Sequence, residues 1–133
     1  MASRSLDDLA PVVKVHALAF LAECRRVNLD VLIYCTLRSN EEQAELFKYG
    51  RFVAGHIRTN AGPGQSLHNP DKNGQSWAFD AIPLIYGKPL WGDMKSLVKM
   101  GACGERAGLE WAGQWVGSLR EYVHFQIKRA GGS

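Results

Sequence analysis

Hydrophobic residues recur at helical spacing along the first part of the chain. The apolar positions that fall on one face of a helix are Leu9, Val13, Ala17, Phe20, Cys24 and Val27. Ser5 and Asp8 stand before or at the start of this stripe, where capping residues are expected. The pattern predicts one long amphipathic helix over residues 5–27.

Shorter patterns predict the remaining elements. Ser39, followed three residues later by Glu42, indicates the start of a second helix. β-branched and aromatic runs, or an alternation of apolar and polar positions, indicate strands. The expected elements after the first helix are a strand at 29–36, a helix at 40–50, a loop at 49–75, strands at 77–83, 109–112 and 122–128, and a helix at 92–107. Together they predict an α+β fold with helices packed on a small, mainly antiparallel sheet.

Composition limits the classes of protein that fit this pattern. A chain of 133 residues that is 46% hydrophobic and 22% charged suits one globular domain spanning residues 1–133. The three cysteines lie in apolar runs and are odd in number, which indicates buried thiols of a reducing cytoplasm. The net charge of +3 comes with no recognised nucleic-acid motif, so we expect no nucleic-acid partner. The start of the chain lacks a signal-peptide layout, and no run approaches the roughly 20 apolar residues of a membrane span. We therefore expect synthesis in the cytoplasm and no stable membrane insertion.

Two histidines and one aspartate in separate segments have the donor types of a hydrolytic zinc site. His68 lies in the long loop, Asp80 in the following strand, and His124 in the last strand. Such a site needs three His or carboxylate ligands and an open position where water is acidified. Glu121 is a carboxylate of the kind that serves as general base beside such a site. A structural role is the alternative for a histidine taken alone.

The residues around these positions form ordered motifs. Ser66-Leu67-His68 is followed by Ala78-Phe79-Asp80, and Glu121-Tyr122-Val123-His124 comes near the C-terminus. Arg38 follows the first expected strand and precedes a helix that contains Gln43. With these motifs the chain resembles, over nearly its whole length, the M15 family of bacterial and phage zinc peptidases. That family includes D-alanyl-D-alanine carboxypeptidases, dipeptidases of the VanX and VanY type, and phage endolysins.

The resemblance implies a Hedgehog/DD-peptidase-like fold and a defined set of site residues. One Zn²⁺ ion would be bound by His68, Asp80 and His124, with Glu121 as the general base. Arg38 would stabilise the oxyanion of the substrate.

Further residues are expected to support the site or line a substrate groove. The resemblance implies that Ser66 supports the site by hydrogen bonding and not as a nucleophile, and Gln43 belongs to the arginine motif. Trp77, Trp115 and Tyr122 flank the motifs and are candidates for a groove, with packing as the alternative.

One departure concerns the spacing between the first two proposed ligands. Eleven residues separate His68 from Asp80, whereas the family has six. The extra residues fall in the polar, turn-prone stretch 69–76, which we expect to bulge from the surface. Asp71 within this stretch is the rival third ligand, and Asp80 is preferred for its Ala-x-Asp context and its strand.

The function implied by the resemblance is that of a phage endolysin without a separate wall-binding domain. The substrate would be the peptidoglycan stem peptide, cut between L-Ala and D-Glu, with a D-Ala-D-Ala carboxypeptidase as the nearest alternative. A monomer made in the host cytoplasm would reach the periplasm and cell wall with a holin-like partner. Two other classes stay open: a non-catalytic zinc-bearing wall-binding module, and a muramidase that uses Glu41 or Glu42.

Overall fold

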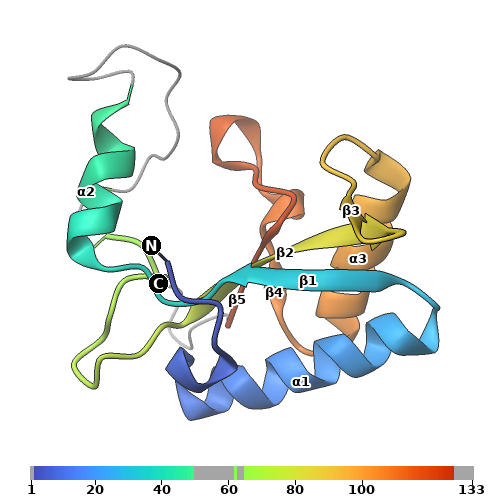
Figure 1. The fold of residues 1–133 in the computed structure, drawn as a ribbon, viewed down its shortest axis with the longest axis horizontal. Helices are drawn as coiled ribbons and strands as arrows, with labels where there is room; N and C mark the ends of the chain where they lie inside the picture. The colour runs from blue at the N-terminus through green and yellow to red at the C-terminus, as the bar shows by residue number, and fades with distance from the viewer. Residues whose placement is uncertain (1, 50–61, 63–64, 128–133) are drawn as a thin grey trace.

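The computed structural model describes residues 2–49, 62 and 65–127. Residues 50–61 and 63–64 of the expected loop, and residue 128 of the last expected strand, lie outside these residues. The elements in chain order are η1 (Leu6–Asp8), α1 (Pro11–Arg26), β1 (Asp30–Cys35), α2 (Asn40–Lys48), β2 (Ala78–Ile85), β3 (Lys88–Pro89), α3 (Met94–Arg106), β4 (Glu110–Trp111), η2 (Ala112–Gln114), η3 (Gly117–Leu119) and β5 (His124–Gln126) (Figure 1). None of the helices in the described part of the chain has the length and apolar character needed to cross a membrane.

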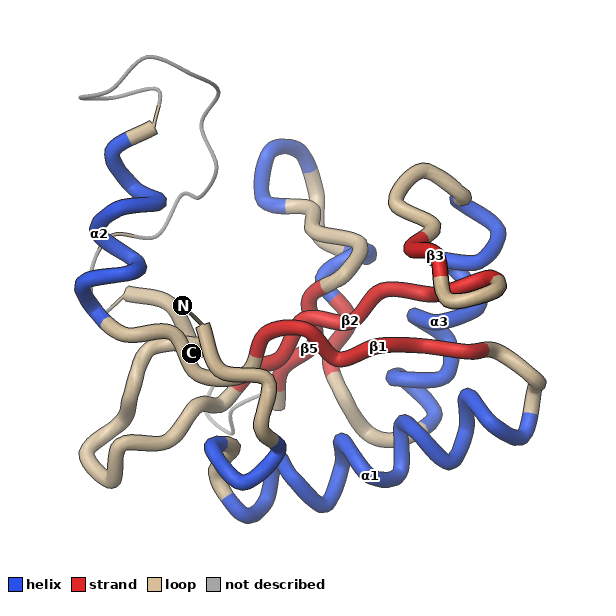
Figure 2. Tube along the Cα trace, viewed as in Figure 1, coloured by secondary structure: helices blue, strands red, loops and turns tan. Residues whose placement is uncertain are grey.

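The strands form one antiparallel sheet. Its order is β1-β2-β5-β4, and β3 pairs with the end of β2 (Figure 2). Helices α1 and α3 pack against each other and against this sheet. The observed architecture confirms the predicted α+β fold with a small antiparallel sheet.

The core lies between the sheet and the two helices α1 and α3. Phe20 of α1 contacts Phe79 of β2 and Phe125 of β5, with ring centroids 5.5 and 4.8 Å away. A Cβ atom at Gly104 of α3 would overlap the Phe125 ring, so this glycine permits the close approach of α3 to β5. Because strand side chains alternate between faces, the neighbours Asp80 and His124 point away from this core.

The prediction of one helix over residues 5–27 is wrong at its beginning. Ser5 caps only the short 3-10 turn η1, by accepting a hydrogen bond from the Asp7 amide. Ala10 then has an extended backbone (ψ 145°), and α1 begins at Pro11. A proline disfavours the helical conformation in the residue before it but suits the first helical position. Pro11 therefore separates the two helices, and the Ala10 amide donates instead to the Ser76 carbonyl at 2.8 Å.

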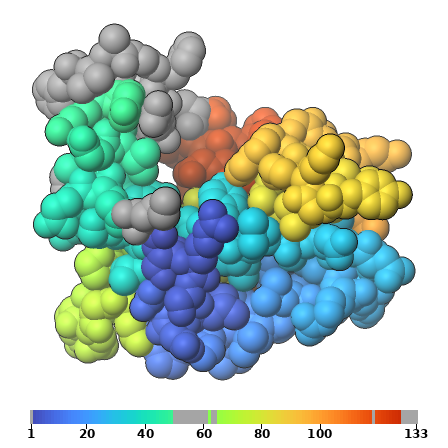
Figure 3. Space-filling model, viewed as in Figure 1, coloured from blue at the N-terminus to red at the C-terminus, as the bar shows by residue number. Residues whose placement is uncertain are grey.

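Helix α2 begins where the sequence predicts. The Ser39 side chain accepts from the Glu42 amide, and the Glu42 side chain accepts from the Ser39 amide, so both halves of the capping box form. The helix stands beside the sheet in Figure 1, and the N-terminal segment lies next to the residues that follow β1 (Figure 3). The Thr36 amide donates to Ser3 at 2.7 Å and thereby joins these two segments.

Strand β3 is absent from the sequence prediction. It follows β2 through a two-residue turn in which Tyr86 and Gly87 have φ values of 49° and 75°. Two successive positive φ values are typical of the tight turns that close β-hairpins. A tyrosine is unusual at the first of these positions, so the residue types did not signal the turn.

Candidate active site

Three adjacent strands bring the first candidate side chains together. Asp80 of β2 pairs with Cys35 of β1 on one side and with His124 of β5 on the other. The neighbouring pair Phe79 and Phe125 is buried in the core. The sheet therefore places Asp80 and His124 side by side on the face opposite the core.

His68 reaches this face from the turn before β2. The Ser66 hydroxyl accepts from the His68 amide at 3.1 Å, and the Asn69 side chain accepts from the Ser66 amide at 3.1 Å. The Arg38 amide donates to the His68 carbonyl at 2.8 Å, and Asn69 donates back to the Arg38 carbonyl at 2.9 Å. These bonds join the segment that carries His68 to the segment that carries Arg38.

The Asp80 carboxylate lies next to both histidines and the Arg38 guanidinium. Its Oδ1 atom lies 3.0 Å from His68 Nε2 and 3.2 Å from His124 Nδ1, and its Oδ2 atom lies 3.7 Å from an Arg38 guanidinium nitrogen. The side chains of His68, Asp80 and His124 are 2%, 10% and 7% exposed, so both imidazoles meet the carboxylate out of contact with bulk water.

The charges of this cluster shift its pKa values strongly. Burial alone would raise the pKa of Asp80, but its contacts with His68 and His124 hold it well below the usual range. Burial would lower the pKa of His68, yet the Asp80 charge and hydrogen bond outweigh it and raise that pKa to about 10. Without a metal ion, the pair is therefore a protonated imidazole on an ionised carboxylate.

The backbone fixes which nitrogen of His68 faces Asp80. The other ring nitrogen, Nδ1, lies 2.8 Å from the Thr36 carbonyl. Because a carbonyl only accepts, Nδ1 carries a proton, and in the neutral ring the lone pair is on Nε2. Without a metal ion, Nε2 also carries a proton and donates it to the Asp80 oxygen that His124 also contacts.

Cys35 adds a thiol to this group. Cys35, His68 and Asp80 each offer a donor atom within 4.8 Å of the others, so this buried group could hold a metal ion. The Cys35 sulfur lies 3.7 Å from His68 Nδ1, the nitrogen that already donates to Thr36. His124 contacts the Asp80 oxygen that faces His68 Nε2 but is not a member of this group of three donors.

Arg38 is held at the edge of the group by a buried amide. One guanidinium nitrogen donates to Gln43 Oε1 at 2.8 Å, and Gln43 is fully buried at the start of α2. Another guanidinium nitrogen lies 3.5 Å from the Cys35 sulfur. The arginine is thus aimed toward Asp80 and not toward bulk solvent.

Tyr34 precedes Cys35 in β1 and packs against the core and against Trp91, with ring centroids 5.5 Å apart. The register of β1 shifts between Ile33 and Cys35, which makes Tyr34 the extra residue of a β-bulge. Burial raises the pKa of its phenol, the charges of Asp80 and Glu121 add to the increase, and Arg38 opposes it. The pKa of Tyr34 thus responds to burial first and to the charges around Asp80 second.

Glu121 lies at the start of the turn that leads into β5. Its amide donates to the Ala112 carbonyl at 3.1 Å, and its carbonyl accepts from the His124 amide at 3.4 Å. The residue is exposed, and its charge acts on Tyr34 together with that of Asp80. An exposed carboxylate has the access to water that a general base requires.

Asp71, the rival ligand, is engaged elsewhere. Its Oδ1 atom accepts from the amides of Asn73 and Gln75 at 2.8 and 2.9 Å, and its Oδ2 atom accepts from the Trp77 indole at 2.8 Å. These bonds keep its pKa below the usual range. Asp71 therefore holds the extra turn together, and Trp77 packs against this turn and the core.

The two other aromatic candidates differ in their surroundings. The Trp115 ring lies beside His124, with centroids 5.6 Å apart. Tyr122 packs against Trp111 and the core, with ring centroids 6.3 Å apart. Trp115 thus covers a site residue, whereas Tyr122 contributes mainly to packing.

All three cysteines, Cys24, Cys35 and Cys103, are free and buried. This confirms the expectation of buried thiols.

Comparisons with known proteins identify a relative in sequence and a solved structure of similar fold. The chain is 32% identical over 131 residues to the peptidoglycan L-alanyl-D-glutamate endopeptidase CwlK of Bacillus subtilis (strain 168), covering 91% of this chain and 74% of that protein. Its fold is similar to the crystal structure of the Serratia marcescens L-Ala D-Glu endopeptidase ChiX, with a TM-score of 0.66, 20% identity, and coverage of 96% of this chain and 88% of that one. No family model matches the chain.

Proposed function

The chain belongs to the M15 family of peptidases, and we propose that it is a zinc-dependent endopeptidase that cuts peptidoglycan stem peptides between L-Ala and D-Glu. The observation that carries the proposal is the convergence of His68 and His124 on one oxygen of buried Asp80. The name of the Bacillus subtilis relative supports the choice of bond.

The proposed ligands are His68, Asp80 and His124, and their donor atoms fit zinc. Two imidazole nitrogens and a carboxylate are a common ligand set of hydrolytic zinc sites. With metal bonds of about 2.0–2.1 Å, tetrahedral ligands lie roughly 3.3 Å apart. The distances of 3.0 and 3.2 Å from Asp80 Oδ1 to the two histidines are close to that spacing. Zinc bound there would acidify a water molecule and polarise the substrate carbonyl.

The other proposed roles follow from charge and exposure. Glu121 accepts the proton of the attacking water and passes it to the leaving amine. Arg38 offers its guanidinium to the oxyanion that develops on the carbonyl oxygen, while Gln43 holds the guanidinium in place. Ser66 supports His68 through the backbone bond described above and takes no part as a nucleophile.

We expect zinc binding to release a proton from His68. The metal-free pair holds that proton because the pKa of His68 is raised to about 10, and a metal requires the neutral ring. Below that pKa the proton competes with zinc, so apparent affinity should rise about tenfold per pH unit where one proton is released. Calorimetric titration in buffers of different protonation enthalpy measures the release. A binding heat that does not change with the buffer would contradict this protonation state.

Digestion of purified peptidoglycan tests the activity and the bond. We expect soluble fragments with new D-Glu amino termini by mass spectrometry, and none after treatment with a chelator. Release of D-Ala would indicate a carboxypeptidase instead. Adsorption to the wall without fragments would indicate a binding module, and digestion that survives the chelator would indicate a metal-independent hydrolase.

We also propose, as the family resemblance implies, that the protein acts in phage lysis and reaches the wall with a holin-like partner. We further propose that it is a monomer with a single domain over residues 1–133. The stretch Gly108–Trp115, which resembles a stretch common in phage members of the family, supports the role in phage lysis.

A further inference from the structure

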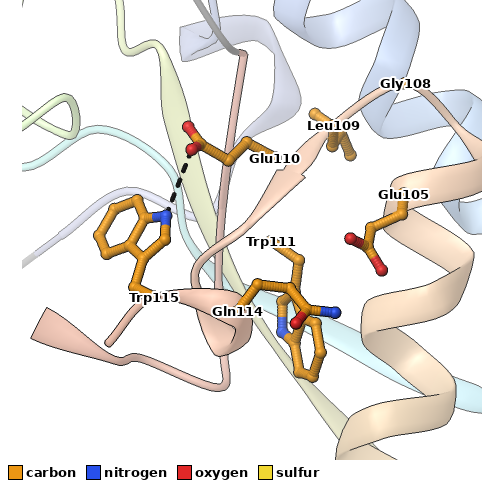
Figure 4. A pocket seen from close by; sticks show the side chains of 7 residues that line it. All are labelled: Glu105, Gly108, Leu109, Glu110, Trp111, Gln114 and Trp115. Atoms are coloured by element: carbon orange, nitrogen blue, oxygen red, sulfur yellow. Dashed lines mark hydrogen bonds between the residues drawn. The ribbon is translucent and has the colours of Figure 1, made fainter. Parts of the chain in front are cut away.

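A chain of hydrogen bonds leads from His124 away from the proposed metal position. His124 Nε2 lies 2.8 Å from Gln126 Oε1, and Gln126 Nε2 donates to Glu110 Oε1 at 2.8 Å. The Trp115 indole donates to the other Glu110 oxygen at 3.3 Å (Figure 4). Glu110 and Gln126 are direct partners in the ladder between β4 and β5, so the sheet itself holds this contact.

Glu110 sets the direction of the hydrogen bonds from His124 through Gln126. An ionised carboxylate only accepts hydrogen bonds, so Gln126 turns its NH₂ group to Glu110 and its oxygen to His124. The amide oxygen also only accepts, so His124 carries a proton on Nε2. His124 Nδ1 lies 3.2 Å from Asp80 Oδ1, which as an ionised carboxylate only accepts, so without a metal ion Nδ1 donates a proton there. When a metal ion replaces that proton, the lone pair on Nδ1 is the one that would bind it, because Nε2 keeps its proton.

The two histidines are thus oriented by different means. His68 donates to the Thr36 carbonyl, which belongs to the backbone and cannot rotate independently. His124 faces a side-chain amide, which can rotate by half a turn and present NH₂ in place of oxygen. The amide of Gln126 keeps its orientation because its NH₂ group donates to Glu110. Glu110 is in turn held in place because its second oxygen accepts from the Trp115 indole.

We propose that Glu110, acting through Gln126, is a positioning residue that fixes the tautomer and ring orientation of His124 for metal binding. The inference rests on the proposed function, since it assigns His124 as a zinc ligand. Groups that accept a hydrogen bond from the other ring nitrogen of a metal-binding histidine commonly contribute about 10–100-fold to metal affinity. Trp115 contributes twice, through its bond to Glu110 and through its ring beside the imidazole.

The substitution Glu110→Gln tests this role. A glutamine at this position can donate as well as accept, so the Gln126 amide is free to turn its NH₂ group to His124. We expect the zinc-loaded variant to weaken the Nε2–H signal of His124, which marks the tautomer held by the Gln126 oxygen, in ¹H–¹⁵N spectra of the imidazole. Zinc affinity, measured by competition with a chelator, should fall about 10–100-fold.

The matched control is Glu105→Gln. Glu105 is an exposed carboxylate on α3 that lines the same surface hollow as Glu110 and Trp115 (Figure 4). This substitution removes the same charge nearby and should leave both the tautomer and the affinity unchanged. Gln126→Leu, which removes the acceptor itself, provides a second variant should Glu110→Gln not fold, and it should move both readouts in the same direction.

The results distinguish a failure of the proposed role of Glu110 from a failure of the proposed function. If wild-type protein binds zinc and digests the wall, but both variants keep its tautomer and affinity, the role of Glu110 is overturned and the proposed function stands. If wild-type protein binds no zinc, the proposed function fails and the inference fails with it.

Discussion

Replacement of Glu121 by glutamine should abolish nearly all wall digestion while zinc stays bound. The amide has almost the shape of the carboxylate but cannot accept the proton of the attacking water. Loss of a general base lowers kcat by about 10²–10⁴-fold. Because Glu121 is not among the proposed ligands, elemental analysis should still find one zinc ion per chain.

The control for Glu121 is Glu41→Gln in the first turn of α2. Glu41 is exposed, and it is one of the carboxylates that a muramidase mechanism would use. Its replacement should leave digestion unchanged. Full activity in Glu121→Gln would remove the assigned base, and loss of activity in Glu41→Gln would favour the muramidase instead.

Replacement of Asp80 by asparagine should remove zinc from the protein. Asp80 contacts both histidines and Arg38, and its charge is what raises the pKa of His68. The amide keeps the volume of the side chain but loses the negative charge that a divalent cation needs. We expect zinc affinity to fall by more than about 100-fold, which exceeds the loss seen when a residue that only hydrogen-bonds to a metal ligand is replaced.

Asp71→Asn is the matched control for this loss. Asp71 binds the amides of its own turn and the Trp77 indole, so its replacement should destabilise that turn by about 1–2 kcal/mol. Zinc content, measured on the purified variants, should stay at that of the wild type. If zinc were lost from Asp71→Asn and retained by Asp80→Asn, the rival ligand would be correct.

The fold was predictable where local patterns decide it. The capping box at Ser39 and Glu42 sets the start of α2, and the sheet follows from alternation that buries Phe79 and Phe125. The prediction failed where one residue overrides a pattern. Pro11 divides a stripe of apolar residues that would otherwise suit a single helix, because it restricts Ala10 to an extended backbone.

The candidate site was predictable only in its charged residues and its proposed metal ligands. The positions of His68, Asp80 and His124 could be proposed because their residue types suit zinc chemistry and the motifs around them resemble those of the M15 family. The contribution of Thr36 could not, because it comes from a backbone carbonyl, which every residue has. The β-bulge at Tyr34, next to Cys35, could not be predicted either, because a one-residue shift of register leaves no mark on the residue types.

Crystals of the zinc-loaded protein, measured on both sides of the zinc absorption edge, would locate the metal ion. We expect one anomalous peak about 2.0–2.2 Å from His68 Nε2, His124 Nδ1 and an Asp80 oxygen, with Glu121 near it but not bound. A peak bound by the Cys35 sulfur in place of His124, or one located at Asp71, would contradict the proposed ligand set.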